Sequence, residues 1–148
     1  MSLLTAVTAP KVLLFIALKG ESFNGNAFAA RALESGSAYA IVDEEAYAPA
    51  GDTRYIVVEN SLKTLQQLAN YHRRRCVHPS SALRVQNGKT TTKELMSTVL
   101  SQTHNVLYTL GNLNNHIGVP LTLLRLRPEH DLAWWKWVPA TRETSRSW

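Results

Sequence analysis

The stretch of sequence that decides the fold is NGKTTT, residues 87–92, which stands directly before a helical pattern. A phosphate-binding loop needs glycine for close approach of the backbone, lysine to reach the β- and γ-phosphates, and a hydroxyl group for Mg²⁺. Gly88, Lys89 and Thr90 supply these groups in that order. No glycine lies between Gly51 and Gly88, so the first half of the usual loop is missing. Taken alone, the stretch favours an ordinary polar helix start.

Strands and helices alternate on both sides of this stretch. Apolar runs typical of strands occur at residues 12–18, 38–42, 55–58 and 105–108. Helical patterns occur at residues 27–35, with Asn26 expected as the N-cap, at 61–75, at 93–101, and from the loop 111–120 through residue 126. Alternation at these lengths predicts an α/β fold.

The composition predicts a folded chain in a reducing, cytoplasmic setting. With 45% apolar and 18% charged residues among 148, the chain can bury a core. Its single cysteine, Cys76, excludes a disulfide framework and a cysteine-rich zinc site. No apolar stretch approaches the roughly 18 residues of a membrane helix. The short run 12–18 fits a strand better than a signal-peptide core, because no small-residue cleavage site follows before residues 19–21.

The net charge of +5 and the isoelectric point near 9.6 suggest a nucleic-acid partner, because a basic surface attracts phosphate backbones. Most of this charge is local, since residues 1–14, 77–86 and 134–148 together carry +4 of it. The last segment holds all four tryptophans, and its rings and basic side chains are the basis for the alternative of a small nucleic-acid-binding protein. We expect neither a nucleic-acid nor a membrane partner.

The loop GNLNNHIGVP, residues 111–120, can present Asn112, Asn114 and Asn115 to a polar ligand. Taken alone, it favours a turn with an asparagine helix cap. Basic residues 73–75 are typical of a solvated helix C-terminus, where they complement the helix dipole. The five histidines lack cysteine or carboxylate partners at metal-ligand spacing, so we assign no metal-binding histidine and no catalytic residue.

Four pieces of the chain, taken in order, resemble the Mur ligases. They are LFIALKGESFNGNAFAARALESGSAYAIVDE at residues 14–44, TLQQLANYHRR at 64–74, NGKTTTKEL at 87–95 and NVLYTLGNLNNHIGVPLTLLRL at 105–126. The resemblance covers residues 14–75 and 87–132. Its most specific feature is the loop GNLNNHIGVP following NGKTTT.

The resemblance implies an α/β fold with an N-terminal UDP-sugar-binding-type domain, residues 1–76, and the incomplete start of a P-loop ATPase domain, residues 77–133. Residues 134–148 are expected to form a disordered tail outside the family pattern. The implied chemistry is ATP-dependent amide formation through an acyl phosphate, with Mg²⁺ neutralising phosphate charge. The implied substrates are UDP-N-acetylmuramoyl-tripeptide and D-alanyl-D-alanine, which serve peptidoglycan synthesis.

The resemblance also implies roles for individual residues. Those expected to bind ATP are Gly88, Lys89, Thr90 and Thr91, with Thr90 also reaching Mg²⁺. Those expected on the substrate side are Lys19, Asn24, Gly25, Asn112, Asn114 and Asn115.

Three segments depart from the family pattern. Ala82 and Val85 stand where the family's loop has glycines, so we expect their Cβ atoms to crowd the phosphates and to strain the turn. The strand with a Mg²⁺-associated glutamate is expected after Leu132, but residues 134–148 stand there instead. Residues 1–12 likewise replace the family's first strand motif.

One hypothesis explains all three departures: the chain is a frame-shifted, truncated product of a Mur ligase gene. Tryptophan has a single codon, so WWKWV at residues 134–138 fixes most of its own DNA. Read one nucleotide earlier, the same DNA encodes five other residues. The first is valine, leucine or methionine, the second is valine, the third is glutamate, the fourth is methionine or valine, and the fifth is glycine. This is the expected strand with its glutamate. Such a chain is expected to be inactive alone, which leaves a non-catalytic UDP-sugar-binding module as the alternative; the nucleotide sequence of the locus decides the hypothesis.

Overall fold

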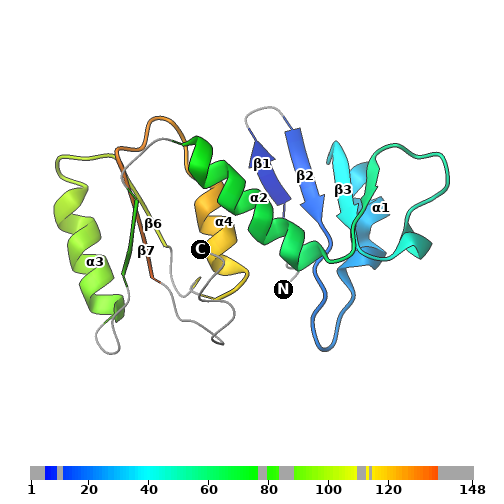
Figure 1. Ribbon diagram of the computed structural model, residues 1–148, viewed down its shortest axis with the longest axis horizontal. Helices are drawn as coiled ribbons and strands as arrows, with labels where there is room; N and C mark the ends of the chain where they lie inside the picture. The colour runs from blue at the N-terminus through cyan, green and yellow to red at the C-terminus, as the bar shows by residue number, and fades with distance from the viewer. Residues whose placement is uncertain are drawn as a thin grey trace. The chain divides into compact units, whose positions relative to one another are not determined.

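A computed structural model describes residues 6–9, 12–76, 80–83, 89–109, 113 and 115–136 of the chain (Figure 1). The chain divides into two compact units, Met1–Leu65 and Gln66–Trp148. The division falls within one helix, α2 (Ser61–Arg75), which has the bounds that the sequence predicts. The sequence places the end of the first domain at residue 76. The division between the two units comes earlier, after Leu65.

The first unit is built on a four-stranded sheet in the order β1-β2-β3-β4. Its strands are β1 (Ala6–Ala9), β2 (Val12–Ile16), β3 (Tyr39–Val42) and β4 (Tyr55–Val57). β1 pairs antiparallel with β2, whereas β2, β3 and β4 run parallel to one another. The strands predicted at residues 12–18, 38–42 and 55–58 are confirmed, and β1 is an addition to them.

Two short helices follow β2 where the sequence predicts one. They are the 3-10 helix η1 (Gly25–Phe28) and α1 (Ala29–Glu34); a second 3-10 helix, η2 (Glu45–Tyr47), follows β3. The predicted N-cap is wrong by two residues, because Oδ1 of Asn24, not of Asn26, accepts the first free backbone N–H at 3.0 Å. Asn26 is instead buried, and its side chain bonds to a residue that follows β3.

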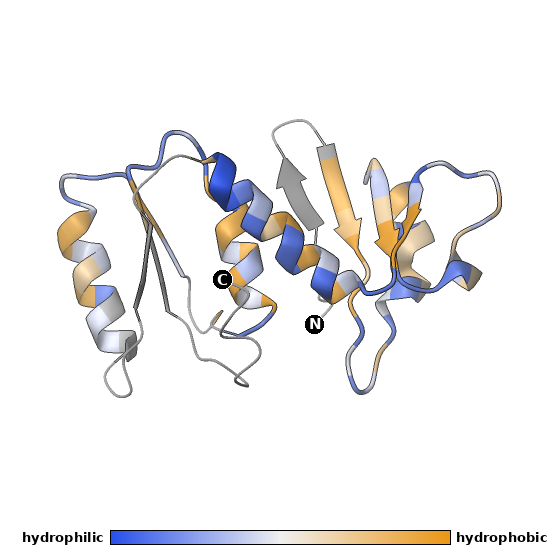
Figure 2. Ribbon diagram, viewed as in Figure 1, coloured by the Kyte–Doolittle hydropathy of each residue, from blue (hydrophilic) through white to orange (hydrophobic). Residues whose placement is uncertain are grey.

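The core of the first unit lies between α1 and the central strands. Apolar side chains from these elements form one cluster: Phe15, Ala17, Ala29, Ala32, Leu33, Ala40 and Val42. Figure 2 shows apolar residues along most of β2 and toward the carboxyl end of β3. Because most of the cluster is alanine, the helix lies close against the strands, and this packing holds the ends of β2 and β3 in place.

The second unit contains a three-stranded parallel sheet in the order β5-β7-β6. Its elements, besides α2, are β5 (Ser80–Leu83), α3 (Lys89–Leu100), β6 (Val106–Tyr108), α4 (Gly118–Leu124) and β7 (Leu132–Lys136). Each connection between the strands contains a helix, as parallel pairing requires. The helix predicted at residues 93–101 and the strand predicted at 105–108 are confirmed as α3 and β6.

β7 extends into the segment for which the sequence predicts disorder. Trp134 pairs with Ser81 of β5 on one side and with Tyr108 of β6 on the other. A central strand satisfies its backbone groups from both sides, and aromatic residues favour strands, so residues 134–136 are ordered against the prediction. β5 likewise lies in residues 77–86, where the sequence shows no periodic pattern. Residues 137–148 lie outside the described part of the chain.

The core of the second unit joins two of its helices, α2 and α4, to the sheet. Its members come from α2, α4 and two strands, with one residue after α4: Ala69, Leu107, Val119, Leu123, Leu126 and Ala133. Leu123 is 1% exposed and is one of the largest fully buried side chains. Among the residues that the structure describes, no helix combines the length and the apolar character needed to cross a membrane.

Two leucines of the second unit provide a matched test of this packing. Leu123→Ala is expected to lower the free energy of unfolding by about 2–5 kcal/mol, because it leaves a cavity beside Val119 and Leu126. Leu95→Ala, at a position on α3 that is 62% exposed, is expected to change it by less than about 0.5 kcal/mol. Urea denaturation followed by circular dichroism measures both; equal effects would contradict the assigned core.

Candidate functional site

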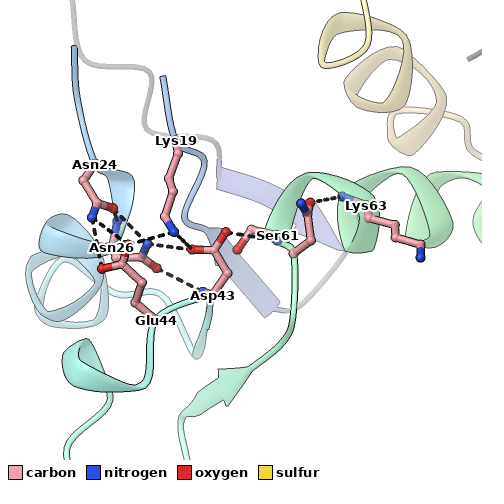
Figure 3. A network of polar contacts seen from close by, with 8 residues as sticks. Lys19, Asn24, Asn26, Asp43, Glu44, Ser61 and Lys63 are labelled. Atoms are coloured by element: carbon pink, nitrogen blue, oxygen red, sulfur yellow. Dashed lines mark hydrogen bonds and ion pairs between the residues drawn. The ribbon is translucent and has the colours of Figure 1, made fainter. Parts of the chain in front are cut away.

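Charged side chains gather in the first unit where β2 and β3 end (Figure 3). Lys19 follows β2, and Asp43 and Glu44 follow β3. Because β2 and β3 run parallel, their carboxyl ends meet at one edge of the sheet. Nζ of Lys19 lies 3.0 Å from Oδ1 of Asp43 and 2.7 Å from Oε1 of Glu44. One ammonium group thus bridges two carboxylates.

Two asparagines connect these carboxylates to η1. Nδ2 of Asn24 donates to both carboxylate oxygens of Glu44 at 3.2 Å. Nδ2 of Asn26 donates to Oδ1 of Asp43 at 2.8 Å, and Oδ1 of Asn26 accepts the backbone N–H of Asp43 at 3.1 Å. Nδ2 of Asn26 also lies 2.8 Å from Oδ1 of Asn24. Together with Lys19, these four residues form what we call the polar network.

The polar network stabilises the ionised forms of its members. Burial opposes the ionisation of Asp43, but hydrogen bonds from Asn26, Lys19 and the backbone of Ser61 outweigh it and hold the pKa of Asp43 below its ordinary value of 3.8. Hydrogen bonds from Lys19 and then Asn24 lower the pKa of Glu44 below 4.5. Hydrogen bonds to Glu44 and then Asp43 raise the pKa of Lys19 above 10.5. At neutral pH the network therefore carries one positive and two negative charges.

Asp43 also connects the polar network to the start of α2. Its Oδ2 accepts the backbone N–H of Ser61, the first residue of that helix, at 3.5 Å. A carboxylate is favourable at a helix N-terminus, where backbone N–H groups carry partial positive charge. Asn60 completes the start of the helix, because its Oδ1 accepts the backbone N–H of Lys63 at 2.8 Å (Figure 3).

Gly25 fixes the loop that carries the two asparagines. Its N–H donates to the carbonyl oxygen of Leu18 at 3.0 Å, which closes the loop back onto the end of β2. A Cβ atom at this position would collide with that same oxygen and would lie 2.8 Å from the nitrogen of Leu18. The structure therefore brings together Lys19, Asn24 and Gly25, the three predicted substrate-binding residues of the first unit, and it gives Gly25 a backbone role.

The second unit has its own candidate site at the carboxyl edge of its sheet. β5 ends at Leu83, and α3 begins at Lys89, so the connection 84–88 joins a strand end to a helix start. Thr90 and Thr91 follow Lys89 in the first turn of α3, and Thr91 is exposed. A helix N-terminus directly after a parallel strand fits a phosphate group, because its free N–H groups attract negative charge. Gly88 lies outside the described residues.

Ala82 does not carry the strain that the sequence predicts. It lies within β5, in register with Trp135 of β7, so its backbone is extended and needs no glycine. Among the described residues, none other than glycine has a positive φ angle. The strain expected at Ala82 is therefore absent, while Val85 lies outside the described part of the chain.

The asparagine-rich loop follows β6 and therefore starts at the same sheet edge as NGKTTT. Oδ1 of Asn115 accepts the backbone N–H of Gly118 at 2.7 Å and that of Ile117 at 3.2 Å. Asn115 thus caps the start of α4. This is the role in a turn and helix cap that the sequence alone favours for the loop. Asn112 and Asn114, predicted with it on the substrate side, lie outside the described residues.

The sequence does not predict three members of the polar network, Asn26, Asp43 and Glu44. It predicts Asn26 as a helix cap, whereas its buried amide donates a hydrogen bond to the Asp43 carboxylate. The signal that identifies the two carboxylates is their place directly after an apolar strand, in the stretch IVDE at residues 41–44. No metal site was predicted from histidines. Within the described residues, no group of three or more His, Cys, Asp or Glu is placed to hold a metal ion.

Residues 86–134 match the family model of the Mur ligase middle domain. The matched segment includes α3, β6 and α4, and it ends within β7, so it contains both helical crossovers of the second unit. Together with the relatives described next, this match shows that the covered residues of the chain are similar to Mur ligases.

The relatives identify one kind of Mur ligase. UDP-N-acetylmuramoyl-tripeptide–D-alanyl-D-alanine ligase from Synechocystis sp. is 46% identical over 121 residues, which are 81% of this chain and 26% of that protein. The ligase of the same name from Escherichia coli is 42% identical over 120 residues, again 81% of this chain and 26% of that protein. The chain thus spans about a quarter of the length of the relatives that it matches.

Solved structures agree with these relatives. A crystal structure of MurF from Acinetobacter baumannii is similar with a TM-score of 0.75 and 38% identity, covering 84% of this chain and 27% of that one. MurF ligase from Thermotoga maritima in complex with ADP has a TM-score of 0.73 and 29% identity, covering 83% of this chain and 28% of that one.

The polar network can be tested by comparing two aspartates. Asp43→Ala is expected to lower the free energy of unfolding by about 1–3 kcal/mol, because it leaves the buried amide of Asn26 without its carboxylate acceptor. Asp52→Ala removes the ion pair with exposed Arg54 and the exposed hydrogen bond from the backbone N–H of Arg54 to Oδ1, and it is expected to cost less than about 1 kcal/mol. Urea denaturation at neutral pH measures both variants, and a smaller loss for Asp43→Ala than for Asp52→Ala would contradict the role assigned to the network.

The same network predicts a pH dependence of stability. Because folding lowers the pKa values of Asp43 and Glu44, their contributions to stability are complete above pH 3.8 for Asp43 and above pH 4.5 for Glu44, and they are lost as the pH falls below these values. The pKa of Lys19 is raised, so its contribution is complete below 10.5 and is lost at higher pH. In the double variant Asp43→Asn, Glu44→Gln, the free energy of unfolding should therefore decrease less steeply as the pH is lowered. An unchanged slope in the acid range would mean that other carboxylates cause the acid sensitivity.

Proposed function

We propose that the chain carries the nucleotide-sugar-binding part and the opening part of the ATP-binding domain of a ligase that joins D-alanyl-D-alanine to UDP-N-acetylmuramoyl-tripeptide. In this proposal, residues 1–76 hold the nucleotide sugar and residues 77–133 begin the ATPase domain. The observation that carries it is the connection of β5 to α3, with NGKTTT at the helix start, in a chain 46% identical to a ligase of that name.

The proposed ATP site uses the start of α3. Gly88 allows the backbone to approach the phosphates, Lys89 neutralises their charge, and Thr91 adds to the first turn of the helix. The hydroxyl group of Thr90 is the proposed ligand of Mg²⁺. ATP supplies the phosphoryl group that activates the substrate carboxylate as an acyl phosphate. Asn112, Asn114 and Asn115 are proposed on the substrate side of the same edge, with the Oδ1 of Asn115 committed to capping α4.

The proposed nucleotide-sugar site uses the polar network. Its excess of one negative charge disfavours direct contact with phosphate and favours ligand groups that donate hydrogen bonds, such as sugar hydroxyls or a base N–H. Lys19 is 42% exposed at its side chain and is held by Asp43 and Glu44, so little side-chain entropy is lost when it meets a ligand. Asn24 presents its amide beside it, and Gly25 keeps the loop in place.

We also propose that the chain is catalytically incomplete alone. β7 ends on Lys136 at the same sheet edge as the start of α3, and in the alternative reading frame this position encodes the glutamate that the family places there. The proposed Mg²⁺ site therefore lacks a carboxylate from this strand. A nucleotide-sugar substrate and the single cysteine support a cytoplasmic location.

Titration calorimetry with UDP-N-acetylmuramoyl-tripeptide tests the proposed function. The chain is expected to bind saturably, and Asn24→Ser is expected to weaken binding by roughly three- to tenfold, because serine keeps the η1 cap but loses the amide. Asn60→Ser, the same change at the cap of α2 outside the network, should leave affinity unchanged. No saturable heat, or equal weakening by both variants, would overturn the nucleotide-sugar site.

Adding ATP, Mg²⁺ and D-alanyl-D-alanine to the same sample separates the two alternatives for the whole chain. Mass spectrometry detects any amide product. We expect binding without amide formation, which corresponds to a binding module without catalysis. Measurable ligation would contradict the proposal that the chain is incomplete.

A further inference from the structure

Glu44 is the carboxylate of the polar network that a ligand can reach. Its side chain is 36% exposed, whereas that of Asp43 is 11% exposed. Oδ1 of Asp43 accepts the amide of Asn26, and its Oδ2 accepts the backbone N–H of Ser61, so both of its oxygens serve the protein (Figure 3). Direct contact with a ligand therefore falls to Glu44 and not to Asp43.

The Glu44 carboxylate still has room for a further hydrogen bond. Its Oε1 lies 2.7 Å from Nζ of Lys19 and accepts Nδ2 of Asn24 at 3.2 Å. Its Oε2 accepts only the same Asn24 amide among the described residues, also at 3.2 Å. An ionised carboxylate accepts about four hydrogen bonds. Oε2 thus stays open to a donor, while the contacts to Lys19 and Asn24 fix the orientation of the group before a ligand arrives.

The place of Glu44 in the fold is that of a ribose acceptor. β2, α1 and β3 form a strand–helix–strand unit whose two strands are parallel neighbours, and Glu44 lies shortly beyond the second strand. In open α/β sheets that bind nucleotides, an acidic side chain near the end of this strand accepts a hydrogen bond from the ribose. The negative charge of Glu44 also disfavours the phosphates of the same nucleotide.

The chemistry of the proposed ligand singles out the ribose as well. In an N-acetylmuramoyl sugar, the acetamido group and the lactyl ether occupy neighbouring carbons, so the free hydroxyls of that sugar are not adjacent. The edge of uracil presents one N–H between two carbonyl oxygens, which a carboxylate repels. The 2′- and 3′-hydroxyls of the ribose are two donors side by side. Of the groups in this ligand, the ribose diol therefore fits a carboxylate best.

We propose that Glu44 accepts hydrogen bonds from the ribose hydroxyls of the nucleotide sugar and thereby selects ribonucleotides over deoxyribonucleotides. Lys19 and Asn24 are positioning residues in this contact, because they hold the carboxylate. The inference rests on the proposed function, since it requires that the nucleotide sugar binds at the polar network.

Titration calorimetry of the full chain with two ligands tests the contact. One ligand is UDP-N-acetylmuramoyl-tripeptide, and the other is the same compound with 2′-deoxyuridine in place of uridine. The deoxy compound is expected to bind roughly three- to tenfold more weakly, because it leaves one acceptor of Glu44 without its donor. In Glu44→Ala the two ligands should bind with about equal affinity. Glu45→Ala, the same change at the exposed neighbouring carboxylate, should keep the preference for ribose.

The ratio of the two affinities separates this contact from a general effect on folding, because a partly unfolded variant loses both ligands equally. Circular dichroism checks the fold of both variants. Equal affinities in the unchanged chain would overturn the ribose contact and leave the proposed function in place. A preference that survives Glu44→Ala would also overturn it, because another group would then read the ribose. Absence of saturable binding by both ligands would overturn the proposed function and this inference with it.

Discussion

Parallel strand pairing is the constraint on which both units depend. Parallel neighbours cannot be joined by a tight turn, so the chain must cross back over the sheet, and in both units the crossovers contain helices. The same geometry places all carboxyl ends at one edge. In the first unit that edge collects Lys19, Asp43 and Glu44, and in the second it joins NGKTTT and the asparagine-rich loop. The candidate sites are therefore consequences of topology before they are consequences of particular side chains.

The two edges differ in how their polar groups are satisfied. The polar network forms its contacts within the protein, so its geometry exists before any ligand arrives. Such a site gains affinity because it is already ordered, and it selects ligands by the donors that its carboxylates still accept. At the edge of the second unit, the helix start of α3 offers N–H groups instead, which select for anions. The chain thus has an acceptor-rich candidate site and a donor-rich candidate site, each at the end of a strand.

Local sequence patterns predicted most of the helices and strands. They failed where the structure of a segment depends on residues far away in the sequence. The bounds of α2 were predicted because its apolar spacing and basic end lie within the helix itself. The choice between Asn24 and Asn26 as the cap depends on Asp43, which lies 17 residues beyond Asn26 and attracts its amide. Trp134 was assigned to a disordered tail because only its pairing with β5 and β6 makes that segment a strand. The carboxylates of the polar network were missed because nothing near them in sequence indicates Lys19.

The order of strands in the second unit has a consequence for its synthesis on the ribosome. β7 is made last among the described elements, yet it lies between β5 and β6, and each of these pairs with β7 and not with the other. The strands of the first unit instead pair in the order in which they are translated. The first sheet can therefore close as it emerges, whereas β5 and β6 wait with open edges until residue 136 has left the exit tunnel. During that interval the nascent second unit exposes unpaired strand edges, which are prone to pair with other chains.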